Sequence, residues 1–258
     1  MGHLLQINGR AVAVDDFGEG TPVLCVHGLG GSSNFWRAVV NGLGDGYRLI
    51  VPDLPSAARS ANDPSLSIES LAGDMLAVLD ALGVDKARVM GHSMGTIVCQ
   101  HLTVMAPERV QDLVLLGPLA QPPEPARGAL MDRAGLARRE GMTGIADTIA
   151  DVALSTATKS TLPDIQGFVR EMVIRQDPQG YAQSCEALSR AQAADASAIT
   201  CPCLLITGDE DKVAPPANVE ALGSALPSAR VLVLDGCGHW TLNEKPTEVI
   251  AAIQAFYG

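Results

Sequence analysis

The chain has 258 residues, of which 47% are hydrophobic and 18% charged, so it is long and apolar enough for one large globular domain. Its formal net charge of −11 argues against a nucleic-acid partner and against an anionic membrane surface, because both attract clusters of Lys and Arg. No apolar run approaches the roughly 18 residues of a membrane span, so we expect no membrane partner.

Short apolar runs alternate with helical patterns along residues 1–117 and again after about residue 201. Two strands near the N-terminus, joined by Asn8-Gly9, are expected to form an antiparallel hairpin. Six further runs lack polar alternation, as strands covered on both faces do: 22–26, 47–51, 88–90, 110–116, 203–207 and 230–234. Helices are expected between them: 34–43, 67–82, 94–106, 216–225 and 246–257. This order predicts an α/β fold with a mostly parallel sheet flanked by helices.

The alternation of strands and helices is interrupted between residues 118 and 198. Three prolines between residues 122 and 125 mark a linker, and the following stretch, rich in Ala and Arg, favours helices without a clear strand. We therefore expect a helical cap at 118–198, inserted between core segments 1–117 and 199–258.

The segment Gly91-His-Ser-Met-Gly95 lies between a predicted strand and a predicted helix. It fits G-x-S-x-G, which alone is weak evidence in a chain with 26 glycines. On a strand-to-helix turn, the glycines allow a strained, closely packed backbone, and the serine hydroxyl is exposed above the sheet. Ser93 is therefore the candidate nucleophile, and the alternative is a serine in a purely structural turn.

A serine hydroxyl needs a base within hydrogen-bond reach to act as a nucleophile. His239 lies in a Gly-rich loop after the last predicted strand, at the edge where open α/β sheets place their sites. The side chain of His92 is expected to point away from the pocket that Ser93 faces, and His27 is expected to brace a loop. His239 is the candidate base.

A carboxylate at another strand end is expected to orient the histidine. The turn Gly208-Asp-Glu-Asp-Lys212 offers three acidic residues, and a solvated acidic turn accounts for any two of them. We select Asp211 over Asp209 because residues 208–215 fit the pattern G-x-x-D-x-x-x-P.

The order Ser93, Asp211, His239 is that of α/β-hydrolases, and the sequence resembles this family along nearly its whole length. His27-Gly-Leu-Gly-Gly31 resembles the family's oxyanion loop, which implies that the N–H groups of Leu29 and Met94 form the oxyanion hole. Within the family the chain is most similar to the 3-oxoadipate enol-lactonase and carboxylesterase branch. The resemblance implies an α/β-hydrolase fold with an inserted helical cap.

Two stretches depart from the family pattern. The loop after the strand at 47–51 is usually D-x-x-G-x-G-x-S, whereas residues 53–60 contain neither glycine. Residues 151–161 lack the tryptophan expected in enol-lactonases. The first departure leaves the conformation of residues 53–60 open, and the second leaves the substrate open.

Side chains at the predicted mouth and in the cap are candidate substrate contacts, with core packing as the alternative: Trp36, Trp240, Phe168, Met172 and Tyr181. A cap arginine is a further candidate, for binding a substrate carboxylate, and a solvated surface charge is the alternative: Arg133, Arg138 or Arg175.

Together these residues predict a serine hydrolase that cleaves a small carboxylic ester or (enol-)lactone through an acyl-enzyme on Ser93. One alternative is a C–C bond hydrolase or perhydrolase with the same triad, and another is a receptor-like ligand-binding protein with negligible turnover. The chemistry needs no metal or organic cofactor, and the six cysteines lack zinc-ligand spacing. Because the first residues do not resemble a signal peptide, we expect a cytoplasmic location.

Overall fold

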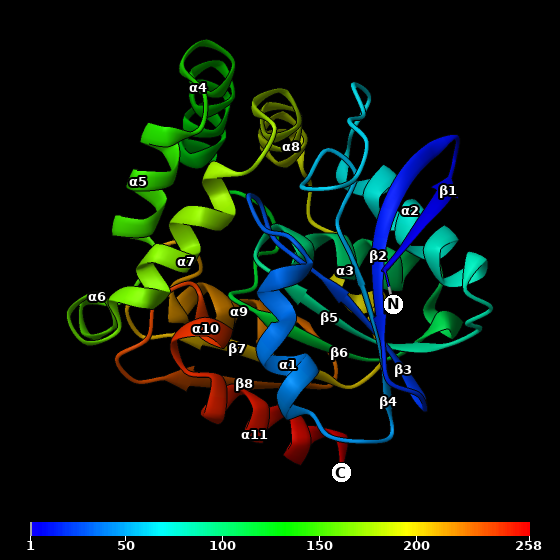
Figure 1. Cartoon of the computed structure of the whole chain (residues 1–258). Helices are drawn as coiled ribbons and strands as arrows, with labels where there is room; N and C mark the ends of the chain where they lie inside the picture. Colours follow the sequence, from blue (N-terminus) through cyan, green and yellow to red (C-terminus); the bar gives the residue numbers. More distant parts are fainter. Residues whose placement is uncertain (1) are drawn as a thin grey trace.

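The computed structural model describes residues 2–258, which form an eight-stranded sheet in the order β1-β2-β4-β3-β5-β6-β7-β8 (Figure 1). The predicted hairpin is β1 and β2; β2 is also antiparallel to β4, and the remaining neighbours run parallel. The strands are Gly2–Ile7 (β1), Arg10–Phe17 (β2), Thr21–Val26 (β3), Tyr47–Pro52 (β4), Ala87–His92 (β5), Val110–Leu116 (β6), Cys203–Gly208 (β7) and Ala229–Leu234 (β8). The predicted mostly parallel sheet is confirmed.

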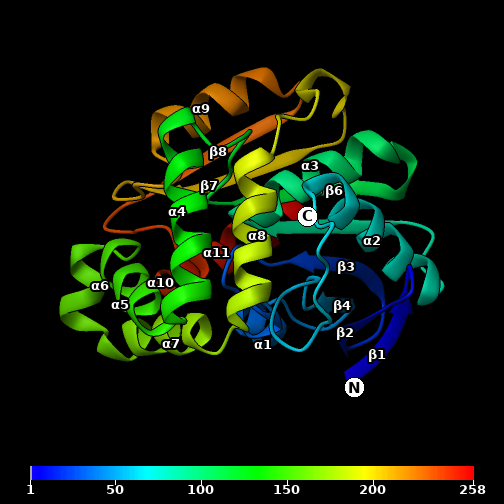
Figure 2. The ribbon, with the colours of Figure 1, turned by 90° about the horizontal axis from the view of Figure 1, so that it is seen from above.

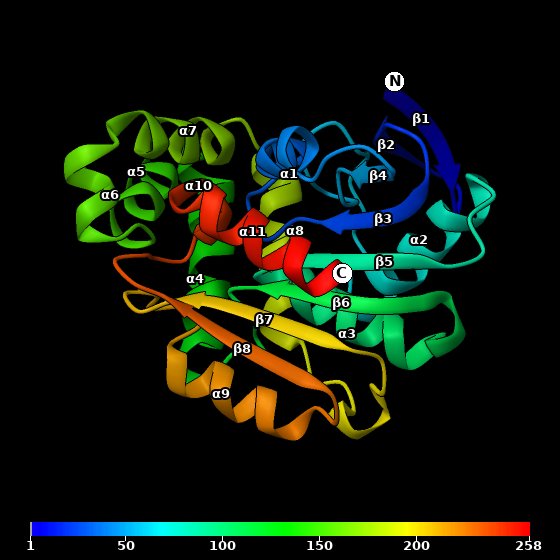
Figure 3. The same ribbon diagram turned by 90° about the horizontal axis from the view of Figure 1, so that it is seen from below.

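Helices cover both faces of this sheet, as Figure 3 shows from below. One face carries α2 (Ile68–Ala81), α3 (Met94–Met105) and α9 (Pro216–Ala225), and the other carries α1 (Arg37–Gly42) and α11 (Pro246–Tyr257). Alternate residues of β3 enter separate apolar clusters on the two faces, which explains why its sequence lacks polar alternation.

Helix α2 illustrates how local sequence sets an element. Ser67 and Ser70 form a capping box, in which each hydroxyl accepts a hydrogen bond from the other residue's N–H group. Leu71, Met75 and Val78 then recur on one helical stripe and are buried against the sheet. The capping box defines where α2 begins, and the apolar stripe defines the face of α2 that packs against the sheet.

Five α-helices lie between β6 and β7, in the segment predicted to form the cap: Glu124–Glu140 (α4), Thr143–Val152 (α5), Thr156–Thr161 (α6), Pro163–Ile174 (α7) and Pro178–Arg190 (α8). Helix α4 packs beside α8, and α5 packs beside α7, as the view from above shows (Figure 2). We refer to residues 118–198 as the cap segment. Among the helices of residues 2–258, none is both long and apolar enough to span a bilayer.

Residues 53–60 form a tight loop after β4. Ser56 (φ 66°) and Ala58 (φ 47°) adopt the left-handed backbone conformation at the two positions where D-x-x-G-x-G-x-S has glycine. This conformation is strained for residues with a Cβ atom. The loop therefore takes a glycine-like path without glycine, and contacts described below hold it.

Candidate active site

Ser93 lies on the turn from β5 into α3, where its backbone has a φ of 50°. The flanking glycines have no room for side chains. A Cβ on Gly95 would lie 2.3 Å from the Val26 carbonyl oxygen, and one on Gly91 would lie 2.7 Å from the Gly95 carbonyl oxygen. The G-x-S-x-G pattern thus lets the strand, the turn and the helix pack closely, with Ser93 at the carboxyl end of β5.

His239 and Asp211 meet from two other strand ends. His239 lies in the loop after β8 and Asp211 in the turn after β7, and His239 Nδ1 is 2.8 Å from Asp211 Oδ2. Gly117, just after β6, has a φ of 54°, and a Cβ there would lie 2.9 Å from the His239 ring. Asp209 points elsewhere and accepts a hydrogen bond from the Cys237 N–H group.

Hydrogen-bond donors surround Asp211. Its Oδ1 accepts from the N–H groups of Val213 and Ala214, both at 2.8 Å, and the Thr207 hydroxyl lies 3.3 Å from Oδ2. Burial alone would raise the pKa of Asp211, but His239 and the two N–H groups outweigh it and lower the pKa to about 2. The ionised carboxylate accepts a hydrogen bond from Nδ1–H of His239, and this tautomer of the imidazole leaves Nε2 as the proton acceptor.

His92 is buried beside Ser93 and is one of the residues around the same cavity, and its ring packs against those of Phe35, His239 and Trp240. His92 Nε2 donates a hydrogen bond to the His239 carbonyl oxygen at 3.0 Å, and the ring stacks on Phe35 with centroids 4.1 Å apart. Burial lowers the pKa of His92 to about 3, so the ring is neutral. This histidine supports the loop that carries His239.

Glu244 is a second support for that loop, and no sequence motif pointed to it. It ends α10 (Thr241–Glu244), is buried, and accepts a hydrogen bond from the Trp240 N–H group at 3.2 Å. Its other oxygen accepts from the Ser155 N–H group at 2.9 Å and from the Thr158 hydroxyl at 2.8 Å, both in the cap segment. Glu244 thus joins the cap segment to the histidine loop.

The loop after β3 lies against Ser93. A Cβ on Gly28 would be 2.8 Å from Ser93 Cβ, so this position requires glycine. His27 braces the loop as predicted: Nε2 accepts from the Leu54 N–H group at 2.9 Å, so Nδ1 carries the proton and donates to the Gly28 carbonyl oxygen at 2.8 Å. Burial lowers the pKa of His27, which keeps the ring neutral.

Ser93, His239 and Trp240 line a cavity of about 280 Å³ between the sheet and the cap segment. Leu29 lines it as well, and Met94 starts α3, where N–H groups of the first turn lack intrahelical acceptors. The remaining wall is mainly apolar and comes largely from the cap segment. Arg133 and Lys212 line it, while none of its lining residues within 2–258 is Asp or Glu.

Of the predicted substrate contacts, Trp240 alone lines this cavity. Trp36 is completely buried in the core beneath α1 and α11, and Tyr181 is buried between the cap segment and the core. Phe168 and Met172 line a separate cavity of about 540 Å³. These four side chains therefore lie outside the lining of the Ser93 cavity, because their packing direction is not specified by periodicity.

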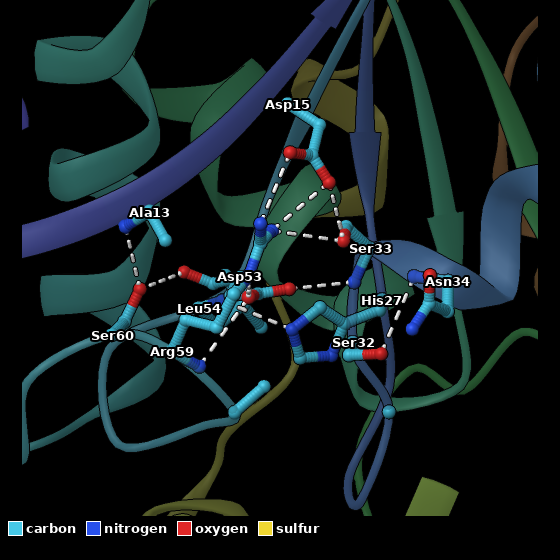
Figure 4. A network of polar contacts seen from close by, with 12 residues as sticks. Ala13, Asp15, His27, Ser32, Ser33, Asn34, Asp53, Leu54, Arg59 and Ser60 are labelled. Atoms are coloured by element: carbon cyan, nitrogen blue, oxygen red, sulfur yellow. Dashed lines mark hydrogen bonds and ion pairs between the residues drawn. The ribbon is translucent and has the colours of Figure 1, made fainter. Parts of the chain in front are cut away.

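The separate cavity borders a polar network that braces residues 53–60 (Figure 4). The buried Asp53 accepts hydrogen bonds from Arg59 Nε at 2.5 Å and from the Ser33 N–H group at 2.7 Å. Arg59 continues to Asp15 at 3.0 Å, and the Ser60 hydroxyl donates to the Asp53 carbonyl oxygen at 2.6 Å. The sequence showed only two opposite charges six residues apart, Asp53 and Arg59, and the burial of Asp53 became evident in the structure.

The three candidate cap arginines differ in their surroundings. Arg138 is bound to Gln179 and Glu186, and the Arg175 side chain is 80% exposed beside Glu171. Arg133 lines the Ser93 cavity, and none of the ion pairs of residues 2–258 includes it.

Comparison with known proteins gives concordant matches. A family model described as "alpha/beta hydrolase fold" matches residues 21–246. The 3-oxoadipate enol-lactonase 2 of Acinetobacter baylyi is 28% identical over 88% of this chain and 85% of its own. A thermophilic esterase from Thermogutta terrifontis, solved with malate bound, has a TM-score of 0.94 at 27% identity, covering 100% and 98% of the two chains. The enol-lactonase from Burkholderia xenovorans LB400 has a TM-score of 0.93 at 26% identity, covering 99% of each chain.

Proposed function

Since this chain belongs to the alpha/beta hydrolase fold family, we propose that it is a serine hydrolase that cleaves a carboxylic ester or lactone through an acyl-enzyme. The observation that carries the proposal is the His239–Asp211 hydrogen bond of 2.8 Å beside a cavity that Ser93 also lines. In this proposal, residues 118–198 cap a core made of 1–117 and 199–258. The names of the esterase and enol-lactonase relatives support the same class of substrate.

Ser93 is the proposed nucleophile and His239 its base. Asp211 holds the Nδ1 proton, so Nε2 takes the proton of the Ser93 hydroxyl as its oxygen attacks the substrate carbonyl carbon. Asp211 also stabilises the imidazolium that forms. Ionisation of Asp211 suits this role, because its pKa of about 2 keeps it charged at neutral pH.

The N–H groups of Leu29 and Met94 are the proposed oxyanion hole. Both residues flank Ser93: Leu29 follows Gly28, which packs on Ser93, and Met94 begins α3. The N-terminus of α3 adds a partial positive charge at the place where the negative charge develops. The imidazolium then protonates the leaving alkoxide, and water activated by His239 releases the acid.

The cavity suggests a small substrate with an apolar middle and an anionic end. Its volume is about 280 Å³, its wall is mainly apolar, and its two charged lining residues are Arg133 and Lys212. In a chain of net charge −11, a cavity with two cations and no lining carboxylate favours an anion. The malate bound in the Thermogutta terrifontis esterase is consistent with this chemistry.

The test is hydrolysis of a panel of p-nitrophenyl esters and lactones by wild type and Ser93→Ala. The panel pairs neutral esters with monoesters of dicarboxylic acids of equal length. Activity that falls by several orders of magnitude in Ser93→Ala supports the serine hydrolase, whereas retained activity refutes it. Arg133→Met should selectively slow the anionic ester, and Arg138→Met, a cap arginine that lies outside the cavity lining, is the control.

A further inference from the structure

Gln176 is a buried cap residue that reaches two core loops. It follows α7 and is 5% exposed. Its Nε2 lies 3.3 Å from the Gly30 carbonyl oxygen, 3.0 Å from that of Gly31 and 3.1 Å from that of Met172. Its Oε1 accepts a hydrogen bond from the Ala58 N–H group at 3.0 Å. A single amide therefore ties the cap segment to the loop after β3 and to the strained loop after β4.

The chemistry of these partners determines how the amide is oriented. The NH₂ group faces three carbonyl oxygens, and the oxygen faces an N–H group. The reversed orientation would place oxygen against oxygen and an NH₂ group against an N–H group. Gln176 is thus a donor toward the loop after β3 and an acceptor toward Ala58.

The loop after β3 has further contacts, and those of Gly30 are with side chains of the cap segment. The Gly28 carbonyl oxygen is already held by His27 and by the Gly31 N–H group. Gly30 has a φ of 73°, and a Cβ there would lie 3.2 Å from Tyr181 and 3.3 Å from Val173, both in the cap segment. Cap side chains therefore cover Gly30, and Gln176 binds its carbonyl group.

We propose that Gln176 is a positioning residue for the oxyanion hole, so that the geometry of the hole depends on docking of the cap. The inference rests on the proposed function, because Leu29, the proposed donor, lies between Gly28 and Gly30. The Gln176 bonds hold the carbonyl groups of Gly30 and Gly31, one and two residues beyond Leu29. An oxyanion donor loses effect when it is displaced by a fraction of an ångström. Gln176 does not line the Ser93 cavity, so its effect is indirect.

The matched control is Gln183. It is also a buried cap glutamine, and its Oε1 accepts a hydrogen bond from the Ser56 hydroxyl in the loop after β4. Its hydrogen bonds within residues 2–258 do not include residues 28–31. Gln176→Leu and Gln183→Leu therefore both weaken cap docking, but Gln176→Leu alone releases the loop after β3.

The experiment compares the full-length variants on the best ester of the panel, with Ser93→Ala as a blank, and follows amide hydrogen exchange of residues 28–34. Gln176→Leu should lower kcat on the order of 10- to 100-fold, change KM little, and speed exchange in this peptide. Gln183→Leu should keep kcat within a few-fold. Gln176→Glu keeps the acceptor for Ala58 but sets a carboxylate oxygen against three carbonyl oxygens, so its loss of kcat should be at least as large as that of Gln176→Leu.

Three outcomes overturn the inference: equal kcat losses in the two Leu variants, a loss confined to KM, or a wild-type rate in Gln176→Glu. If Gln176→Leu does not fold, Gln176→Glu alone decides. Activity that persists in Ser93→Ala refutes the proposed function instead, and the exchange measurement then still tests whether Gln176 holds the loop after β3.

Discussion

Ala58 carries backbone strain that glycine would relieve. Its φ is 47°, and its methyl group is exposed, so little packing is lost on removal. Ala58→Gly should raise the free energy of unfolding by about 0.5–1 kcal/mol, since relief of a left-handed Cβ outweighs the added entropy of the unfolded chain. Urea unfolding measures this change.

Two neighbours serve as controls for that prediction. Ala57 is buried and lacks a positive φ, so Ala57→Gly should destabilise the protein. Ser56→Gly should also fail to stabilise, because the Ser56 hydroxyl binds both Gln183 and the Asp63 N–H group. Equal changes in the free energy of unfolding for Ala57→Gly and Ala58→Gly would contradict the prediction that Ala58 is strained.

Asp211 and Asp209 share one turn but have different partners. Asp211→Asn should reduce kcat on the order of 10³- to 10⁴-fold, because an amide can stabilise the wrong tautomer of His239 and does not stabilise its charge. Asp209→Asn, which alters the hydrogen bond from the Cys237 N–H group, should keep kcat within a few-fold of the wild-type value. Steady-state kinetics of the two variants test the selection of Asp211 over Asp209. Equal losses of kcat in the two variants would contradict that selection.

The lowered pKa of Asp211 has a consequence for stability at acid pH. Its folded-state pKa of about 2 lies below the unfolded value of 3.8, so its contribution is full above the unfolded pKa and is lost as pH falls through about 2. The difference in unfolding free energy between wild type and Asp211→Asn should therefore narrow from pH 4 to pH 2. A difference that does not change over this range would contradict the assigned shift.

At the scale of elements, the short helix α10 links the cap segment to the histidine loop through Glu244. All three of its partners donate to its carboxylate. Glu244→Gln turns an NH₂ group toward one of these donors, so we expect a loss of about 1–3 kcal/mol in unfolding free energy. Glu248→Gln, at an exposed position of α11, is the control and should change stability by less than about 0.5 kcal/mol.

At the scale of the whole molecule, burial should control thiol reactivity. Cys201 is partly exposed and the other five cysteines are buried. Burial raises the pKa of the Cys25, Cys99 and Cys237 thiols, which further slows their reaction. An aromatic disulfide reagent should therefore label one thiol quickly in the native protein and six after unfolding in urea. Rapid labelling of several thiols in the native protein, or of any thiol in the native Cys201→Ser variant, would contradict the burial of the other five cysteines.

Much of the fold followed from local patterns. Strands buried on both faces appear as uninterrupted apolar runs, and the helix expected at 67–82 is α2 at Ile68–Ala81, so the positions of these elements agree with the sequence to within a few residues. The cap segment was expected to be helical, and its five α-helices lie where the strand pattern is interrupted. These features depend on interactions between residues close in sequence.

The selection of Ser93, Asp211 and His239 also came from local context, because each follows a strand and parallel strands end at a common edge of a sheet. The tertiary structure decided which side chains face the cavity: it turned Trp36 and Tyr181 into the core and left Arg133 on the cavity wall. It also brought Gln176 and Glu244 to loops 146 and 89 residues away in sequence. Such contacts depend on how the cap docks, and docking is set by complementarity between surfaces far apart in the chain, which no local pattern encodes.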